Sequence, residues 1–328
     1  MLEIMASEGI VRYSQQEWQM QQTLDPVQLG EKIETLITQY PDAVAELTLL
    51  NRCASQLSEV LRGTQDPVQL VFPSGDLTTA TQLYQDTPIA KVMNAIVQQV
   101  IVKSIEKIPQ QRGIRLLEIG AGTGGTTSYI LPHLNPNQTE YLFTDIGKLF
   151  TSKAQEKFKE YRFLRYAALD IEEDPTTQGF DAHQYDVIIA ANVLHATRSM
   201  KQTLTNVRKM LAPGGMLVLL EITSCQRWLD LVFGLLEGWW RFQDSELRPD
   251  YPLLSRTTWK QLLGEMGFTQ VVTMPEIEGM PEILSQQTVI VAQGSKTRFS
   301  QTASERKGFT PAPYRNVSPD WGSCSGSS

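Results

Sequence analysis

The stretch Leu-Leu-Glu-Ile-Gly-Ala-Gly-Thr-Gly-Gly-Thr-Thr, residues 116–127, decides the fold of this chain. Its apolar run predicts a strand, its glycines a tight turn, and its last residues the start of a helix. Glycine adopts positive φ and has no Cβ, so a ligand can lie against the main chain. The helix start adds unpaired N–H groups and a partial positive charge, which favour an anionic group. The stretch therefore predicts a nucleotide-like ligand without saying which one.

Strands and helices alternate from residue 115 onward, which is typical of a mostly parallel sheet with helices on both faces. The fold we expect is therefore α/β, a Rossmann-like sheet. The final short strands are where an antiparallel edge would form. A long helix over residues 84–108, with Pro88 in its first turn, would lead into the sheet. The expected strands are residues 115–119, 141–144, 163–169, 185–192, 216–222, 268–273 and 287–292, and the expected helices are residues 126–131, 149–159, 200–211 and 257–266.

Three further regions are distinguished by their patterning. Residues 1–80 show helical spacing of apolar residues, over 31–39 and 43–62, and predict a helical region that acts as a lid. Residues 81–294 form the ligand-binding core. An insertion at residues 223–256, rich in large apolar side chains, interrupts that core and could roof a pocket. Residues 295–328 are polar and unpatterned, which is typical of a linker or disordered tail. This tail, without a second catalytic signature, favours a domain cut from a longer protein.

Composition excludes several classes of function. The chain has 328 residues, of which 41% are apolar and 20% charged, as in ordinary globular proteins. Its formal charge of -7 disfavours nucleic acid as a partner. No apolar run reaches the ~18 residues of a membrane span, and the N-terminus has no signal-peptide pattern. Cys53, Cys225 and Cys324 are scattered without metal-site spacing. We expect a cytoplasmic protein without a metal, because unclustered cysteines fit a reducing compartment.

Three acidic residues select among the nucleotide-like ligands. Glu118 lies two residues before Gly120, where a ligand ammonium could use a carboxylate and a nicotinamide pyrophosphate could not. Asp145 closes the second strand, where a carboxylate can accept both ribose hydroxyls. Asp170 with Ile171 closes the third, where an adenine amino group could donate to the carboxylate. An amino acid end, a ribose and an adenine together predict S-adenosylmethionine.

Several segments strengthen this interpretation through a resemblance. The glycine loop resembles the first motif of class I S-adenosylmethionine-dependent methyltransferases. More narrowly, residues from about 45 to 293 resemble the C-methyltransferase domain of modular polyketide synthases. The resemblance implies Pro in many relatives where this chain has Glu237. The segments that carry the resemblance are Leu83-Tyr84 with Asn94, the glycine loop, Phe-Thr-Asp-Ile at 143–146, Ala-Asn-Val-Leu-His-Ala-Thr at 191–197, Leu-Glu-Ile-Thr at 220–223 and Gly-Leu-Leu-Glu-Gly-Trp-Trp at 234–240.

The resemblance implies a methyl donor, a site and a partner. The substrate would be a β-ketoacyl chain on the phosphopantetheine arm of an acyl carrier protein, next to other polyketide synthase domains. Trp239 and Trp240 are candidates for substrate contact. A basic patch for the acidic carrier could include Lys201, Arg208, Lys209, Arg227 and Arg241. The expected cofactor-binding residues are Tyr84, Glu118, Gly120, Ala121, Gly122, Thr123, Gly124, Asp145, Ile146, Asp170, Ile171 and Asn192.

His195 and Glu221 form a candidate catalytic pair. His195 follows the fourth strand and Glu221 lies at the end of the fifth, and those strand ends are neighbours in a sheet of this order. A carboxylate holds a histidine in one tautomer and makes it a stronger general base. The α-carbon between a ketone and a thioester must lose a proton before it can be methylated. We therefore expect His195 to take that proton and hold the enolate, while Glu221 orients His195.

Three alternatives stay open. An O-methyltransferase of the same assembly lines could use the same pair on a hydroxyl or enol. A reductase that uses NADPH would explain the G-x-G-x-x-G match of the glycine loop, although the chain has no Tyr-x-x-x-Lys pair. A methyltransferase-like domain that binds but no longer catalyses is disfavoured by the presence of both His195 and Glu221.

Overall fold

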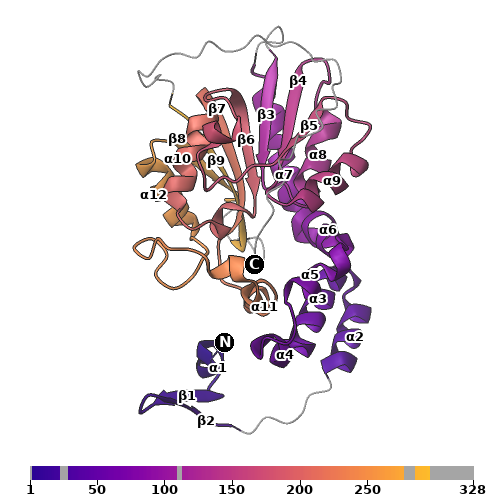
Figure 1. Cartoon of the computed structure of the whole chain (residues 1–328), viewed down its shortest axis with the longest axis vertical. Helices are drawn as coiled ribbons and strands as arrows, with labels where there is room; N and C mark the ends of the chain where they lie inside the picture. Colours follow the sequence, from indigo (N-terminus) through magenta and orange to yellow (C-terminus); the bar gives the residue numbers. More distant parts are fainter. Residues whose placement is uncertain (1, 23–28, 109–112, 277–284, 296–328) are drawn as a thin grey trace, which may run out of the picture.

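A seven-stranded sheet forms the centre of the computed structural model, which describes residues 2–22, 29–108, 113–276 and 285–295. The strand order is β5-β4-β3-β6-β7-β9-β8 (Figure 1). Neighbours from β5 to β7 run parallel, whereas β9 runs antiparallel to both β7 and β8. The antiparallel strand therefore lies inside the sheet, and β8 is the edge. The strands are β3 (Ile114–Ile119), β4 (Thr139–Thr144), β5 (Leu164–Ala167), β6 (Tyr185–Ala191), β7 (Leu211–Ile222), β8 (Thr269–Met274) and β9 (Gln287–Gln293).

Helices cover both faces of the sheet, which confirms the predicted α/β class. Leu116 packs with the helices α7, α8 and α9, whereas its neighbour Leu117 packs on the other face with α10 and α12. Because both faces are buried, the central strands appear in the sequence as continuous apolar runs rather than alternating ones. The bounds are α7 (Pro88–Ile105), α8 (Gly125–Ile130), α9 (Lys148–Lys157), α10 (Met200–Met210) and α12 (Arg256–Glu265).

The helix predicted over residues 84–108 begins later than expected. Gln82–Asp86 forms a separate π-helical turn, and α7 begins at Pro88. Thr87 breaks the helix because the residue before a proline is disfavoured in the helical region, and its ψ is 153°. Its hydroxyl caps α7 by accepting the Ala90 amide at 3.3 Å, and it donates to the Leu83 carbonyl at 3.0 Å.

The N-terminal region is largely helical, but a hairpin that the sequence did not predict follows its first helix. The strands β1 (Val11–Ser14) and β2 (Glu17–Met20) pair around Gln15 and Gln16, whose φ angles are 54° and 67°. Glycine and asparagine usually mark such turns, so a Gln-Gln turn gives no signal. The predicted helix over residues 43–62 is broken at Gln56. The helices are α1 (Leu2–Ser7), α2 (Leu29–Gln39), α3 (Val44–Ser55), α4 (Leu57–Leu61), α5 (Val68–Val71) and α6 (Thr78–Thr81).

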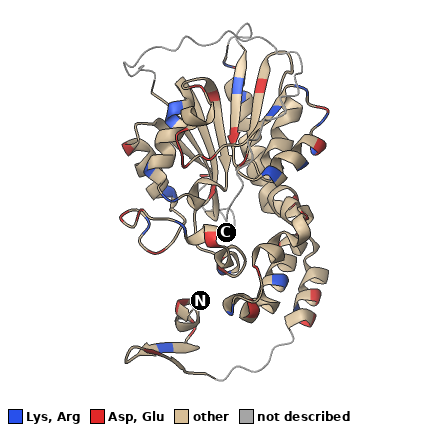
Figure 2. Cartoon of the chain, viewed as in Figure 1, with Lys and Arg blue, Asp and Glu red and all other residues tan. Residues whose placement is uncertain are grey.

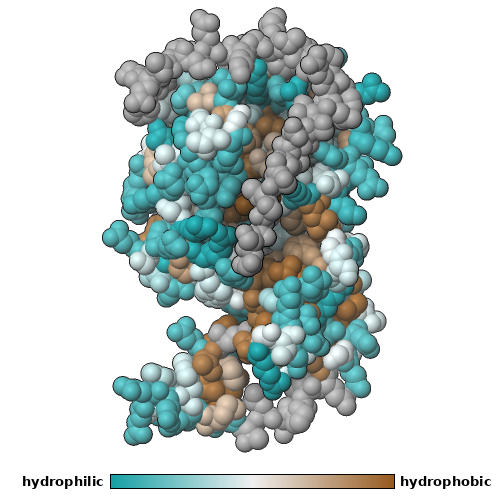
Figure 3. Space-filling model, in the orientation of Figure 1, coloured by the Kyte–Doolittle hydropathy of each residue, from teal (hydrophilic) through white to brown (hydrophobic). Residues whose placement is uncertain are grey.

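The insertion joins this helical region to the sheet. It contains α11 (Arg227–Val232) and two short turns, and Val232 is buried against α3 and α5. Apolar surface gathers where the upper and lower parts of the molecule meet (Figure 3). Within the described ranges, no helix has the length and apolarity needed to cross a membrane. Apart from residue 295, the predicted tail at 295–328 lies outside the described residues.

Candidate active site

A cavity of about 230 Å³ lies at the carboxyl ends of β3, β4, β6 and β7. The strand order reverses between β3 and β6, and such a switch point is where ligands bind in open α/β sheets. A larger cavity of about 460 Å³ adjoins it, between the end of the N-terminal region and α9. The smaller cavity is lined by Phe72, Tyr84, Glu118, Gly120, Ala121, Gly122, Thr123, Gly125, Thr126, Asp145, Phe150, Ala191, Asn192 and Leu220.

The glycine loop needs its glycines for two physical reasons. Gly120, Gly122 and Gly124 have φ angles of 57°, 53° and 71°, a region that side chains disfavour. A Cβ on Gly120 would lie 2.7 Å from both methyl carbons of Val193, in the segment that leads to His195. The loop therefore packs directly against the candidate catalytic segment. Gly124 turns the chain into α8 but is not among the residues that line the cavity.

Glu118 is a buried carboxyl group at the floor of this cavity. Its Oε2 accepts the Thr127 hydroxyl at 2.5 Å and the Tyr141 hydroxyl at 2.6 Å. Burial raises its pKa to about 7, against the smaller lowering by these two hydrogen bonds. At neutral pH the group is therefore divided between its neutral and ionised forms. A cation that enters the cavity would favour the carboxylate.

Asp145 shares the cavity with Glu118. Its Oδ2 accepts the Gly122 amide at 3.0 Å, and its Oδ1 accepts the Gly147 amide at 2.7 Å. Burial raises its pKa, and these two amides oppose that shift. Each carboxylate oxygen can accept more than one hydrogen bond, so Asp145 retains capacity for ribose hydroxyls.

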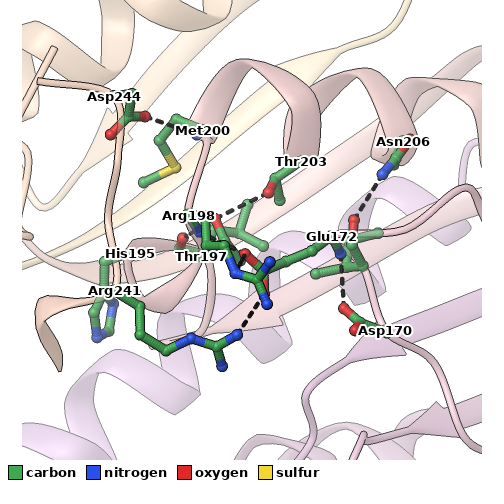
Figure 4. Close-up of polar contacts among 12 residues, drawn as sticks. Asp170, Glu172, His195, Thr197, Arg198, Met200, Thr203, Asn206, Arg241 and Asp244 are labelled. Atoms are coloured by element: carbon green, nitrogen blue, oxygen red, sulfur yellow. Dashed lines mark hydrogen bonds and ion pairs between the residues drawn. The ribbon is translucent and has the colours of Figure 1, made fainter. Parts of the chain in front are cut away.

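The other expected adenosine contacts lie outside the cavity lining. Ile146 is 69% exposed, next to Asp145. Asp170 accepts the Glu172 amide at 2.9 Å through its Oδ1, as Figure 4 shows. Ile171 is buried in the core with α10 and α12, so its side chain cannot line a ligand site in this structure. The expected contact of Ile171 with the cofactor stays a prediction, and its side chain packs into the core.

Asn192 and Tyr84 face the same cavity from opposite sides. Asn192 has a φ of 55°, unusual for a residue with a side chain, at the end of β6. Its buried Oδ1 has no hydrogen-bond partner among the described residues. A buried polar atom without a partner is costly, so its retention indicates a ligand donor. Tyr84 is held because its carbonyl accepts the Asn94 side-chain amide at 2.9 Å.

His195 and Glu221 lie in direct contact. The His195 Nδ1 is 2.7 Å from the Glu221 Oε2, and the Leu194 amide donates to the Glu221 Oε1 at 3.0 Å. Glu221 is fully buried and His195 nearly so. An ionised carboxylate only accepts, so it holds the proton of a neutral histidine on Nδ1 and leaves Nε2 as the acceptor. The geometry is therefore the one expected of an oriented general base.

The structure separates the two adjacent tryptophans. The Trp239 ring lies 5.5 Å from the His195 ring at 71°, and it stacks on Phe233 at 6.1 Å. Trp240 is 48% exposed, and its indole N–H donates to the Gly234 carbonyl at 2.8 Å. Only Trp239 is thus placed beside the candidate base.

One buried cation beside the base had not been singled out from the sequence. Arg248 lies at the end of the insertion and is 1% exposed, and its guanidinium donates to the His195 carbonyl at 2.8 Å. Figure 4 shows the neighbouring part of this network, where Asp244 accepts the Met200 amide at 2.8 Å. An Asp and an Arg four residues apart gave a weak signal that only the fold makes specific.

The expected basic patch is largely engaged within the chain. Lys209 contacts Asp174 at 2.6 Å, and Arg208 donates to the Met266 carbonyl at 2.5 Å. Arg227 pairs with Glu8, and Arg241 lies 3.5 Å from Glu172. Lys201 is exposed on α10. Positive and negative residues are interspersed over the face seen in Figure 2.

The family model and the solved structures that resemble this chain are described as methyltransferases or as a CMeT domain. A family model described as a methyltransferase domain matches residues 117–217. The chain is 70% identical to the CurJ carbon methyltransferase, with a TM-score of 0.87 over 90% of this chain and 78% of that one. It is 30% identical to the CMeT domain of the citrinin polyketide synthase, with a TM-score of 0.81 over 90% and 77%. The trans-methyltransferase CalH, solved in complex with SAH, is 28% identical, with a TM-score of 0.68 over 81% and 72%.

A much longer relative is similar over most of this chain. The non-reducing polyketide synthase adrD of Penicillium roqueforti is 38% identical over 242 residues. The match covers 73% of this chain and 10% of that protein. The chain therefore spans about a tenth of the length of this curated relative.

Proposed function

This chain belongs to the carbon methyltransferase domains of polyketide synthases and uses S-adenosylmethionine, and from that premise we propose how it works. We propose that it methylates the α-carbon of a β-ketoacyl thioester carried by an acyl carrier protein. The contact between His195 and Glu221 carries the proposal. A carbon acid between two carbonyl groups needs a base before it becomes a nucleophile, and this contact supplies an oriented one.

The residues of the cavity fit S-adenosylmethionine. The unpartnered Asn192 Oδ1 and the buried Glu118 carboxyl group suit an ammonium donor, and Asp145 suits ribose hydroxyls. The positive φ of Gly120 and Gly122 allows the main chain to approach a ligand closely. When bound, the cofactor supplies a methyl group on a sulfonium, which a carbon nucleophile can take.

His195 generates that nucleophile. Its Nε2 accepts the proton of the acceptor α-carbon, because Nδ1 is held by Glu221. The buried carboxylate stabilises the imidazolium that results, and the imidazolium N–H then donates to the enolate oxygen. General base catalysis of this kind contributes roughly 10²–10⁴-fold to the rate. Trp239 packs against the imidazole and excludes water from that side.

The walls of the substrate site come from the two apolar regions outside the sheet. Residues 1–80 and the insertion at 223–256 meet in one apolar cluster that includes Leu83, Val232 and Phe233. Tyr84 and Phe72 belong to this cluster and also line the cavity. We propose that an acyl chain enters along this contact, with neighbouring polyketide synthase domains supplying the carrier.

The position of the new methyl group tests the proposal. The protein is incubated with a β-ketoacyl thioester, on a carrier protein or on free pantetheine, and with S-adenosylmethionine carrying a ¹³C methyl group. The expected product has the label on the α-carbon by NMR, and His195→Ala forms it at a rate lower by roughly 10²–10⁴. A label on oxygen identifies an O-methyltransferase and refutes the proposal. Equal rates with both thioesters would refute the role of the carrier.

A further inference from the structure

The loop that bears His195 owes its shape to contacts from another part of the chain. Leu194–Ala196 forms a single turn, and α10 starts only at Met200. The main-chain carbonyls between them lie outside any helix or strand. A buried carbonyl without a donor costs free energy, so these groups need donors from elsewhere.

Arg248 supplies most of those donors. Its Nη1 donates to the His195 carbonyl at 2.8 Å, and its Nη2 donates to the carbonyls of Thr197 and Arg198 at 2.7 and 3.2 Å. Its Nε donates to the Asp244 Oδ1 at 2.6 Å. Four donor contacts on one planar guanidinium fix both its position and the path of the loop, because the fork permits little rotation.

Asp244 contacts both Arg248 and the start of α10. While its Oδ1 holds Arg248, its Oδ2 accepts the Met200 amide at 2.8 Å. The neighbouring Gln243 amide donates to the Arg198 carbonyl at 2.8 Å. One short stretch of the insertion therefore contacts this segment at His195, at Arg198 and at Met200, the first residue of α10.

The Arg248 side chain is fully buried, which makes the arrangement more than a surface ion pair. Its side chain has 0% exposure and Asp244 has 15%. Removing one partner of a buried pair leaves a charge without compensation. The Phe242 ring lies 5.3 Å from the Arg248 guanidinium and closes it off further. A positive charge is thus held in the protein interior against the main chain of the candidate base.

We propose that Asp244 and Arg248 act as a positioning pair that sets the place of the His195 imidazole relative to Glu221 and to the acceptor carbon. This inference rests on the proposed role of His195 as the base. Glu221 fixes the imidazole through its Nδ1, and Arg248 fixes the same residue through its carbonyl. The insertion thus has two parts: the segment through Trp240 covers the site, and the segment after it holds the base in register.

Kinetics of Arg248→Met, Arg248→Lys and Asp244→Asn test this role. We expect Arg248→Met to lower kcat at least tenfold, with KM for the thioester and Kd for S-adenosylmethionine changed less than twofold. Arg248→Lys should recover part of kcat, because an ammonium can satisfy some of the carbonyls. Asp244→Asn is a milder change that keeps one acceptor oxygen, and it should lower kcat about threefold. It provides the test if Arg248→Met does not fold.

A matched control and a double variant separate positioning from stability. Arg115, at the opposite end of β3, is also largely buried and contacts Gln184 at 2.7 Å, so Arg115→Met should lower the melting temperature without lowering kcat. In the His195→Ala background, Arg248→Met should cause no further loss of the residual rate, which is roughly 10²–10⁴ below that of the parent, because residues that act through one group are not additive. An unchanged kcat in Arg248→Met, or losses that multiply, would overturn the inference. Full activity of His195→Ala alone would instead refute the proposed function.

Discussion

Replacement of Glu221 by glutamine is the sharpest test of the proposed mechanism. The carboxylate accepts at both oxygens, from His195 at 2.7 Å and from the Leu194 amide at 3.0 Å. A glutamine offers only one acceptor oxygen, and its other terminal atom is a donor. One of the two contacts must therefore be lost, whichever way the amide is turned.

Both orientations of the glutamine impair the base. If its oxygen stays with Leu194, its NH₂ group faces the His195 Nδ1 and forces the proton onto Nε2, which can then no longer accept. If its oxygen faces His195, the NH₂ group opposes the Leu194 amide, and the buried donor costs about 1–3 kcal/mol. We expect kcat to fall by roughly 10²–10⁴, or about 3 to 5 kcal/mol of activation free energy.

The assay is a single-turnover methyl transfer to a β-ketoacyl pantetheine thioester, followed by mass spectrometry. Calorimetry with S-adenosylmethionine serves as the control and should give the same Kd for the parent and Glu221→Gln, since Glu221 does not line the cofactor cavity. A Glu221→Gln rate within threefold of the parent, with Kd unchanged, would refute the reasoning about the tautomer.

The site supports four further predictions. Gly120→Ala should lower the free energy of unfolding by about 2 to 4 kcal/mol, because an alanine is strained at the left-handed φ of 57° and its Cβ would overlap with Val193. A second change, Val193→Ala, removes the overlap but not the strain, so it should restore only part of the lost free energy in urea denaturation. S-adenosylmethionine should bind several-fold more tightly at pH 8 than at pH 6, because Glu118 has a pKa of about 7 and its carboxylate suits the ligand ammonium. If the Kd of a Glu118→Gln variant showed the same pH dependence, Glu118 would not be its cause. Because its pKa is raised, Glu118 keeps its proton in the folded state at pH values above about 4.5, where the unfolded chain loses it. The protein without ligand should therefore lose stability between pH 4.5 and 7, which melting curves at several pH values would measure. Trp239→Ala should lower kcat at least tenfold while Trp240→Ala stays within twofold, and steady-state rates that reverse this order would exclude the assignment of Trp239 to the site.

The sheet could be predicted because its physics is local. The expected strands coincide with β3 to β9 to within five residues at each end, because each parallel strand contains a short apolar run. The proximity of His195 to Glu221 followed from strand order alone, since β6 and β7 are neighbours. The order of the strands was therefore enough to predict the contact between His195 and Glu221.

The remaining features depend on contacts that sequence spacing does not encode. Arg248 binds main-chain carbonyls of a segment far away in the chain, and any residue type offers such a carbonyl. Whether the Ile171 side chain faces the core depends on how the chain turns after β5, and in the structure this side chain packs into the core. The hairpin at the N-terminus was missed because Gln15 and Gln16 adopt left-handed conformations without the usual turn residues.

The interior position of β9 has a consequence for how the protein is made. During synthesis the ribosome releases β7 well before β9, yet β9 must enter between β7 and β8, and Thr288 on it pairs with Glu221. At the usual rates of chain growth, the open edge of β7 waits on the order of ten seconds for its partner. Throughout that interval the nascent sheet carries an unpaired strand edge beside its future base, which is the exposure that chaperones protect. The methyltransferase site is thus completed by the last strand of this sheet in chain order.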